Sequence, residues 1–135
     1  MTFSITSKNR LATVNQKLQD IFNISIRRTP VDFGIAFMGG LRTEDEQHEL
    51  FVSGKSLKDG YRNKSKHQLG DAVDFIPHVN GQYSFDMRYY LIIIGVIFSC
   101  ANELDIKIRS GANWDRDETW IDDQNFKDFP HIELI

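Results

Sequence analysis

Residues 65–74 read SKHQLGDAVD, and this stretch decides how the rest of the chain is interpreted. It places His67 and Asp74 seven positions apart, with Gly70 between them. Near its end the chain carries a second stretch rich in the same residue types, DFPHIE at 128–133. Two histidines and one carboxylate are the ligand set of many hydrolytic zinc sites, which keep one coordination position for water. The two stretches together predict a zinc centre.

The local pattern around each stretch favours convergence of these side chains. Gly70 fits a bend that turns His67 and Asp74 toward one point. In a strand, successive side chains point to opposite faces, so Val73 and Phe75 would enter the core and leave Asp74 facing a cleft.

At the C-terminus, His131 and Glu133 share one face of a predicted strand that starts at His131. Asp128 lies before this strand and before Pro130, where a bend would bring its carboxylate beside metal-bound water. Glu133 is expected either to support the metal ligands or to form a salt bridge.

Composition limits the possible classes of protein. A chain of 135 residues with 41% hydrophobic and 26% charged residues is typical of one globular domain, which we place at 1–135. The net charge of -3 argues against a nucleic-acid partner. The single cysteine, Cys100, cannot form an internal disulfide. We expect the protein to act as a monomer.

No segment is typical of targeting or membrane insertion. The N-terminal residues lack a basic region followed by an apolar run, so no secretory signal is predicted. The most hydrophobic stretch, 89–101, is shorter than the roughly 20 residues that span a bilayer. It is therefore expected to be a core element.

Hydrophobic periodicity predicts three helices. Apolar residues at helical spacing favour a helix over 11–26, and length favours a long buried helix over 86–104. Thr43 and Glu46 have the spacing of a capping box, which predicts the start of a short helix carrying Gln47. Residues 53–64 are polar and are expected to form a loop.

Strands are expected between these helices. They are predicted at 31–38, at 72–76 with Pro77 as its end, at 104–109 by alternation, and from 131 to the C-terminus, with a turn at 80–81. This order of elements predicts an α+β fold with helices on one face of a small, mainly antiparallel sheet, and the metal site in a cleft over the sheet.

The pattern S-x-H-x-x-G-x-A-x-D at 65–74, followed by D-x-x-H at 128–131, resembles the M15 family of zinc peptidases. That family includes D-alanyl-D-alanine carboxypeptidases and dipeptidases, and phage endolysins that are L-alanyl-D-glutamate peptidases. TPVDF at 29–33, GLRT at 40–43 with Gln47, and GANWD at 111–115 are similar to the endolysin branch.

The resemblance implies a role for each site residue. His67, Asp74 and His131 would bind zinc, and Asp128 would be the general base that moves a proton from water to the leaving amine. Arg42 and Ser65 match positions that contact the substrate or its developing oxyanion. These last two residues would be expected to line the cleft.

The function implied is a peptidoglycan endopeptidase, a phage or prophage endolysin that cuts the L-alanyl-D-glutamate bond of the stem peptide. Such an enzyme would accumulate in the host cytoplasm and reach the periplasmic cell wall after release. The nearest alternative is cleavage of the terminal D-Ala-D-Ala bond. Two further alternatives are a non-haem iron oxygenase and a zinc module without catalytic activity.

Trp114 and the acidic segment that follows it each allow two interpretations. Trp114 is expected to be either a wall of the cleft that contacts substrate or a core residue. The acidic segment that follows would bind Ca²⁺ or remain a solvated loop, and the second is favoured because Trp120 and Phe126 replace the glycine and glutamate of an EF-hand loop. The acidic residues concerned are Asp115, Asp117, Asp122 and Asp123.

Overall fold

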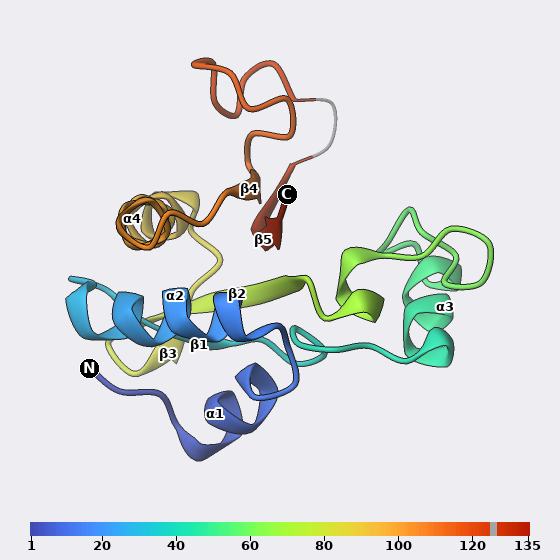
Figure 1. Cartoon of the computed structure of the whole chain (residues 1–135), viewed down its shortest axis with the longest axis horizontal. Coiled ribbons are helices and arrows are strands. Elements are labelled where there is room, and N and C mark those ends of the chain that lie inside the picture. Colours follow the sequence, from blue (N-terminus) through green and yellow to red (C-terminus); the bar gives the residue numbers. More distant parts are fainter. Residues whose placement is uncertain (125–126) are drawn as a thin grey trace.

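The computed structural model of the chain describes residues 1–124 and 127–135 (Figure 1). Its elements, in chain order, are α1 (Ile5–Leu11), α2 (Gln16–Arg28), β1 (Asp32–Ile35), α3 (Glu44–Val52), the 3-10 helix η1 (Lys66–Leu69), β2 (Ala72–Val79), β3 (Gln82–Tyr83), α4 (Met87–Glu103), β4 (Ile108–Gly111) and β5 (Asp128–Leu134). Among the described residues, no helix is both long enough and apolar enough to cross a membrane.

The strands form one antiparallel sheet in the order β1-β2-β5-β4, with β3 paired to β2. The predicted α+β class with a mainly antiparallel sheet is therefore confirmed. Helices α2 and α4 pack against each other, and α4 also packs on β2 and β5 (Figure 1). The long connection from β4 to β5 places the last strand in the middle of the sheet, directly beside β2.

The core lies between these two helices and the sheet. Its fully buried side chains come from α2, α4 and three strands: Leu18, Ile21, Phe22, Ile93, Ile97, Phe33, Val73, Phe75 and Ile132. Helix α3 lies apart from this layer, beside η1 (Figure 1). Burial of Val73 and Phe75 leaves Asp74, between them on β2, on the opposite face, as alternation predicted.

The predicted helix over 11–26 is wrong in its boundaries, because its first residue belongs to a separate helix and the rest corresponds to α2, Gln16–Arg28. Helix α1 ends at Leu11, and α2 starts at Gln16 with Asn15 as its N-cap, whose side chain accepts a hydrogen bond from the Lys17 backbone (3.0 Å). The Asn15 backbone N–H is bonded to the Gly70 carbonyl (2.8 Å). This bond to a distant loop competes with helix continuation, and no local pattern reveals it.

The starts of α3 and α4 were predicted correctly. Thr43 and Glu46 form a reciprocal capping box at the start of α3, with distances of 3.1 and 2.9 Å. Asp86 caps α4, which covers nearly the whole of the predicted 86–104 segment.

The strand boundaries needed more correction. Strand β2 continues through Pro77 to Val79. The Pro77 carbonyl accepts a hydrogen bond from the Ser84 N–H (3.0 Å), on the edge of β2 away from β1. The proline nitrogen, which has no hydrogen, lies on this same edge, so the pairing with β1 loses no hydrogen bond. The turn at Asn80-Gly81 has positive φ at both residues (52° and 78°), as a tight hairpin requires.

The other three predicted strands also differ from the prediction. Strand β1 is confined to Asp32–Ile35 within the predicted 31–38 segment. Strand β4 starts only at Ile108, because α4 is capped at Leu104 and Asp105 adopts a positive φ of 56°. Strand β5 starts at Asp128 rather than at His131 and includes Pro130.

Candidate metal centre

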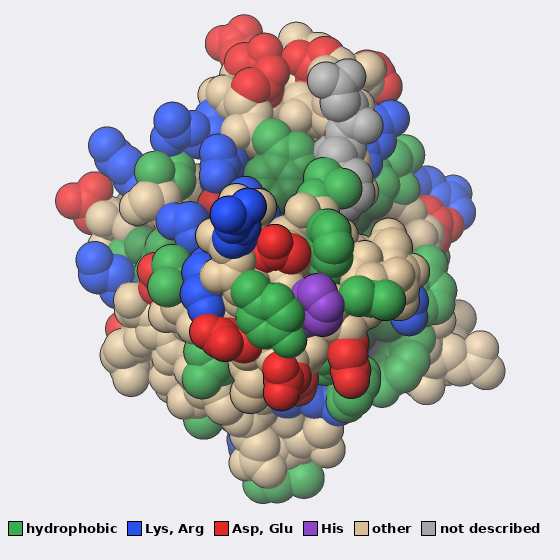
Figure 2. Space-filling model, turned by 90° about the vertical axis from the view of Figure 1, so that its right-hand side faces the viewer, with side chains coloured by type: hydrophobic (Ala, Val, Ile, Leu, Met, Phe, Trp, Pro, Cys, Tyr) green, Lys and Arg blue, Asp and Glu red, His purple; other side chains and the backbone are tan. Residues whose placement is uncertain are grey.

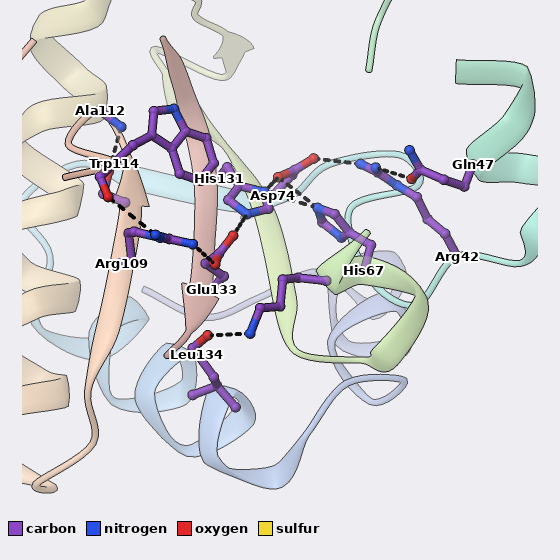
Figure 3. A network of polar contacts seen from close by, with 12 residues as sticks. Arg42, Gln47, His67, Asp74, Arg109, Ala112, Trp114, His131, Glu133 and Leu134 are labelled. Atoms are coloured by element: carbon purple, nitrogen blue, oxygen red, sulfur yellow. Dashed lines mark hydrogen bonds and ion pairs between the residues drawn. The ribbon is translucent and has the colours of Figure 1, made fainter. Parts of the chain in front are cut away.

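Strand pairing brings the predicted ligands together. Asp74 on β2 lies directly opposite His131 on β5, and η1 presents His67 from the segment before β2 (Figure 3). The distances are 3.2 Å from His67 Nε2 to Asp74 Oδ1, 3.2 Å from His131 Nδ1 to Asp74 Oδ1, and 3.3 Å between the two ring nitrogens. One atom from each of three residues far apart in sequence thus meets at a single point.

The spacing of these atoms fits a metal ion. Ligands at about 2.0–2.2 Å from a tetrahedral zinc ion lie roughly 3.3–3.6 Å from one another. The observed triangle of 3.2, 3.2 and 3.3 Å is close to one face of such a tetrahedron. The three side chains therefore form a group that could hold a metal ion.

Hydrogen bonds to the outer nitrogens hold both histidine rings in an orientation suited to metal binding. His67 Nδ1 lies 3.0 Å from the Gly40 carbonyl oxygen, and His131 Nε2 lies 2.8 Å from Glu133 Oε1. Both partners can only accept, so these two nitrogens carry the hydrogens. His67 Nε2 and His131 Nδ1 then face the shared position beside Asp74, where each could supply its lone pair to a metal ion that displaces any hydrogen on it.

Arg42 holds the second oxygen of Asp74. Its Nη2 donates to Asp74 Oδ2 (2.8 Å), its Nε to the Met38 carbonyl (2.8 Å) and its Nη1 to Gln47 Oε1 (3.0 Å). The Arg42 side chain is only 10% exposed. These bonds leave Asp74 Oδ1 free to face the two histidines. An additional contact between Arg42 and an oxyanion stays a prediction.

Glu133 makes the contacts of both alternatives raised for it, a hydrogen bond to the predicted ligand His131 and a salt bridge, while a role in metal binding stays a prediction. Its Oε1 accepts from His131 and its Oε2 accepts from Arg109 Nη2 (2.7 Å). The Arg109 guanidinium lies 5.4 Å from the centre of the Trp114 ring, and that ring lies 5.3 Å from the His131 ring (Figure 3). The Trp114 ring therefore covers His131 on the side nearer to β4.

Burial and neighbouring charges shift the pKa values of three side chains at the site. Burial raises the pKa of Asp74, but the adjacent His67 and His131 outweigh it and hold the pKa well below its usual range. Burial lowers the pKa of His131, while its hydrogen bonds to Asp74 and Glu133 raise it, with a net value of about 9. For Glu133, burial opposes ionisation, but His131 and Arg109 bring the pKa down to about 2.

Asp128 behaves differently from these two carboxylates. Burial, with a further contribution from the Asp74 charge, raises the pKa of Asp128 to about 6. It is the first residue of β5 and pairs with Gly111, where a Cβ would lie 2.1 Å from the Asp128 carbonyl oxygen. The prediction that Asp128 lies outside the strand is therefore wrong. A bulge in the β4–β5 pairing, together with the glycine, brings it to the site instead.

The group lies in a cavity of about 840 Å³. One wall comes from the segment that follows α3 and runs through η1, and the opposite wall includes Arg109 and Trp114. Ser65 lines the cavity and is buried, and its Oγ has no hydrogen-bond partner among the described residues. All of the predicted site residues outside the acidic loop border this one cavity: Arg42, Ser65, His67, Asp74, Trp114, Asp128 and His131.

The acidic loop is separate from this cavity. Carboxylate oxygens of Asp115, Asp117 and Asp123 lie within 4.8 Å of one another, and all three residues are exposed. The Gln124 amide donates to Asp115 and Asp123, at 3.3 and 2.6 Å. Asp122 is not part of this group. The comparison with an EF-hand at Phe126 lies outside the described residues, and Ca²⁺ binding here stays a prediction.

Sequence reasoning missed two partners of the site. The Gly40 carbonyl that orients His67 and the Arg109 guanidinium that holds Glu133 were not anticipated. Gly40 belongs to a family-like motif, but a backbone acceptor leaves no signature. Arg109 faces Glu133 across the β4–β5 pair, and only knowledge of that pairing would have identified it.

Comparisons with known proteins agree with this fold and identify the family. A sequence model described as phage L-alanyl-D-glutamate peptidase matches residues 1–135, and the chain belongs to this family. It is 34% identical over 137 residues to an L-alanyl-D-glutamate peptidase of Escherichia phage T5, covering 98% of this chain and 97% of that protein. The predicted resemblance to the endolysin branch is confirmed.

A solved structure extends the agreement to three dimensions. The Serratia marcescens L-Ala D-Glu endopeptidase ChiX matches with a TM-score of 0.82 at 26% sequence identity. The match covers 99% of this chain and 90% of that one. Similarity over nearly the whole of both chains includes every strand that carries a residue of the metal group.

Proposed function

We propose that the chain is a single zinc peptidase domain, 1–135, which hydrolyses the L-alanyl-D-glutamate bond of peptidoglycan stem peptides as a phage or prophage endolysin. Family membership supports the bond, since relatives of this chain are named for it. The observation that carries the chemistry is the triangle formed by His67, Asp74 and His131 at the floor of an accessible cavity.

Zinc is the metal that we propose for this group. Two imidazoles and one carboxylate suit zinc, and the triangle matches tetrahedral coordination with a position left for water. When bound, zinc would supply a Lewis acid and lower the pKa of water to about 7. The same ligand types also occur in non-haem iron oxygenases, so metal analysis of the purified protein separates the two.

Asp128 is proposed as the general base. Its pKa of about 6 keeps it ionised at neutral pH and close enough to neutrality to exchange protons. It would accept a proton from the attacking water and deliver it to the amine of the leaving D-glutamate. A purely structural metal site has no need of such a group, which argues against a non-catalytic zinc module.

Other side chains are proposed to orient the substrate and the ligands. Arg42 keeps Asp74 in the geometry that metal binding requires. Ser65 lines the cavity, and its hydroxyl is proposed as a substrate contact because it matches a substrate-contacting position of the family. Trp114 would form a flat wall for the peptide. We propose that the enzyme is released from the host cytoplasm and then reaches its substrate in the periplasmic cell wall.

Digestion of purified peptidoglycan tests the proposal. The zinc-loaded protein should release fragments with new C-terminal L-alanine and new N-terminal D-glutamate, identified by mass spectrometry after end labelling. The Asp128→Asn variant is the matched negative control. Release of free D-alanine alone would instead establish the D-Ala-D-Ala alternative and contradict the proposed bond.

A further inference from the structure

The charge inside the cavity is opposite to that of the chain. Six of the lining residues are lysine or arginine and three are aspartate or glutamate, although the net charge of the chain is -3. The outer surface on the α3 side, in contrast, shows several acidic side chains around hydrophobic ones (Figure 2). A cleft lined by one sign of charge concentrates ligands of the opposite sign. The cavity is therefore suited to an anionic ligand.

The acidic and basic groups of the cavity are not evenly distributed. Asp74 and Glu133 are each held by an arginine and by histidine. Four lysines, in contrast, come from a single wall, the segment 55–66. Lys64 in this wall is already paired with Glu44. The remaining three, Lys55, Lys58 and Lys66, form what we call the lysine wall.

The lysine wall has unused capacity to bind anions. Within residues 1–124 and 127–135, no carboxylate lies within salt-bridge distance of Lys55, Lys58 or Lys66. Lys66 is half-buried next to His67, and the one acceptor of its ammonium among the described residues is the Leu134 carbonyl (3.2 Å). An ammonium has three donors, so at least two remain for a ligand. Lys55 and Lys58 are exposed at the mouth of the cavity.

The proposed substrate carries the matching charge. D-glutamate has one amino group and two carboxyl groups, and only one carboxyl can continue a linear peptide. The other remains a free carboxylate on the residue that supplies the leaving amine, unless it is amidated. We propose that the lysine wall is the subsite for this carboxylate and that the enzyme therefore discriminates against stem peptides whose D-glutamate is amidated. This inference rests on the proposed function and adds a specificity determinant to it.

Two synthetic peptides test the inference. They share an L-alanyl-D-glutamyl bond and differ only in whether the free carboxyl of D-glutamate is a carboxylate or a carboxamide. For the wild-type protein, kcat/KM should be about tenfold or more higher for the carboxylate peptide, and this ratio should shrink with added salt because partly exposed ion pairs are screened.

A triple variant and its charge-matched control then locate the effect. In Lys55→Gln/Lys58→Gln/Lys66→Gln the ratio of the two kcat/KM values should fall toward 1. Changing three exposed lysines elsewhere should leave the ratio at its wild-type value, and the control triple is Lys8→Gln/Lys17→Gln/Lys107→Gln. Circular dichroism and zinc content verify that both variants are folded and loaded.

The outcomes separate this inference from the proposed function. If the wild-type protein cuts both peptides at the L-alanyl-D-glutamate bond with equal kcat/KM, the lysine wall is not a carboxylate subsite, while the proposed function stands. A triple variant that loses activity on both peptides equally, or that retains the wild-type ratio, also overturns the inference. If the wild-type protein cuts neither peptide but is active on peptidoglycan at another bond, both proposals fail.

Discussion

Replacing Glu133 by glutamine should weaken metal binding although Glu133 is not a proposed ligand. The carboxylate uses one oxygen for His131 Nε2 (2.8 Å) and the other for Arg109 Nη2 (2.7 Å). An amide has only one oxygen, so its NH₂ group must face one of these two donors. If it faces His131, the ring hydrogen has to move to Nδ1, the nitrogen that points at the metal position. If it faces Arg109, the guanidinium loses its ion pair.

The expected size of the effect follows from the role of such partners. Groups that orient a metal-bound histidine typically contribute 10- to 100-fold to metal affinity or activity. This range corresponds to about 1.4–2.7 kcal/mol of binding free energy. Competition against a chromophoric zinc chelator measures the dissociation constant, and thermal melting of the metal-free variant shows whether the fold is retained.

A matched substitution separates this role from a general effect of charge. Glu103 forms a similar two-oxygen pair with Arg28, but both side chains are more than half exposed and lie far from the cavity. Glu103→Gln should leave zinc affinity unchanged. A folded Glu133→Gln variant that binds zinc within twofold of the wild type would refute the proposed positioning role.

Three further predictions concern the base, its ionisation and the core. Asp128→Asn should lower kcat on the order of 10²–10⁴-fold while one zinc per chain is retained, measured by single-turnover kinetics and elemental analysis. In the wild type, kcat/KM should fall as the pH drops through a pKa no higher than about 6, because protonated Asp128 cannot accept a proton and a bound cation only favours its ionised form. An acid limb centred above pH 7 would assign the base to another group. Ile93→Ala, at a fully buried position of α4, should cost about 2–5 kcal/mol in urea unfolding, whereas Ile92→Ala, at a 43% exposed position, should change stability by less than about 1 kcal/mol.

The sequence predicted those parts of the fold that local chemistry determines. The capping box at Thr43 and the turn at Asn80-Gly81 are each specified by residues within a few positions of one another. Alternation around Asp74 predicted its orientation correctly, since burial of its two neighbours requires the opposite face. The other candidate site residues were identified from motifs that resemble the family.

The errors occurred where distant segments decide the local structure. The break before Asn15 depends on a bond to Gly70, and the start of β5 at Asp128 depends on close approach to Gly111. Similarly, the Arg109 contact with Glu133 follows from strand pairing across a long connection. None of these contacts between distant segments produces a periodic or local signal, although Asn15, which caps α2, is a residue type favoured at helix starts.

The most direct test of the proposed metal centre is anomalous diffraction at the zinc absorption edge from crystals grown with zinc. The structure predicts one strong peak within about 2.0–2.2 Å of His67 Nε2, Asp74 Oδ1 and His131 Nδ1. It also predicts that His131 Nε2 remains bonded to Glu133. A peak bound through His131 Nε2, or zinc found only at the acidic loop around Asp117, would contradict the proposed centre.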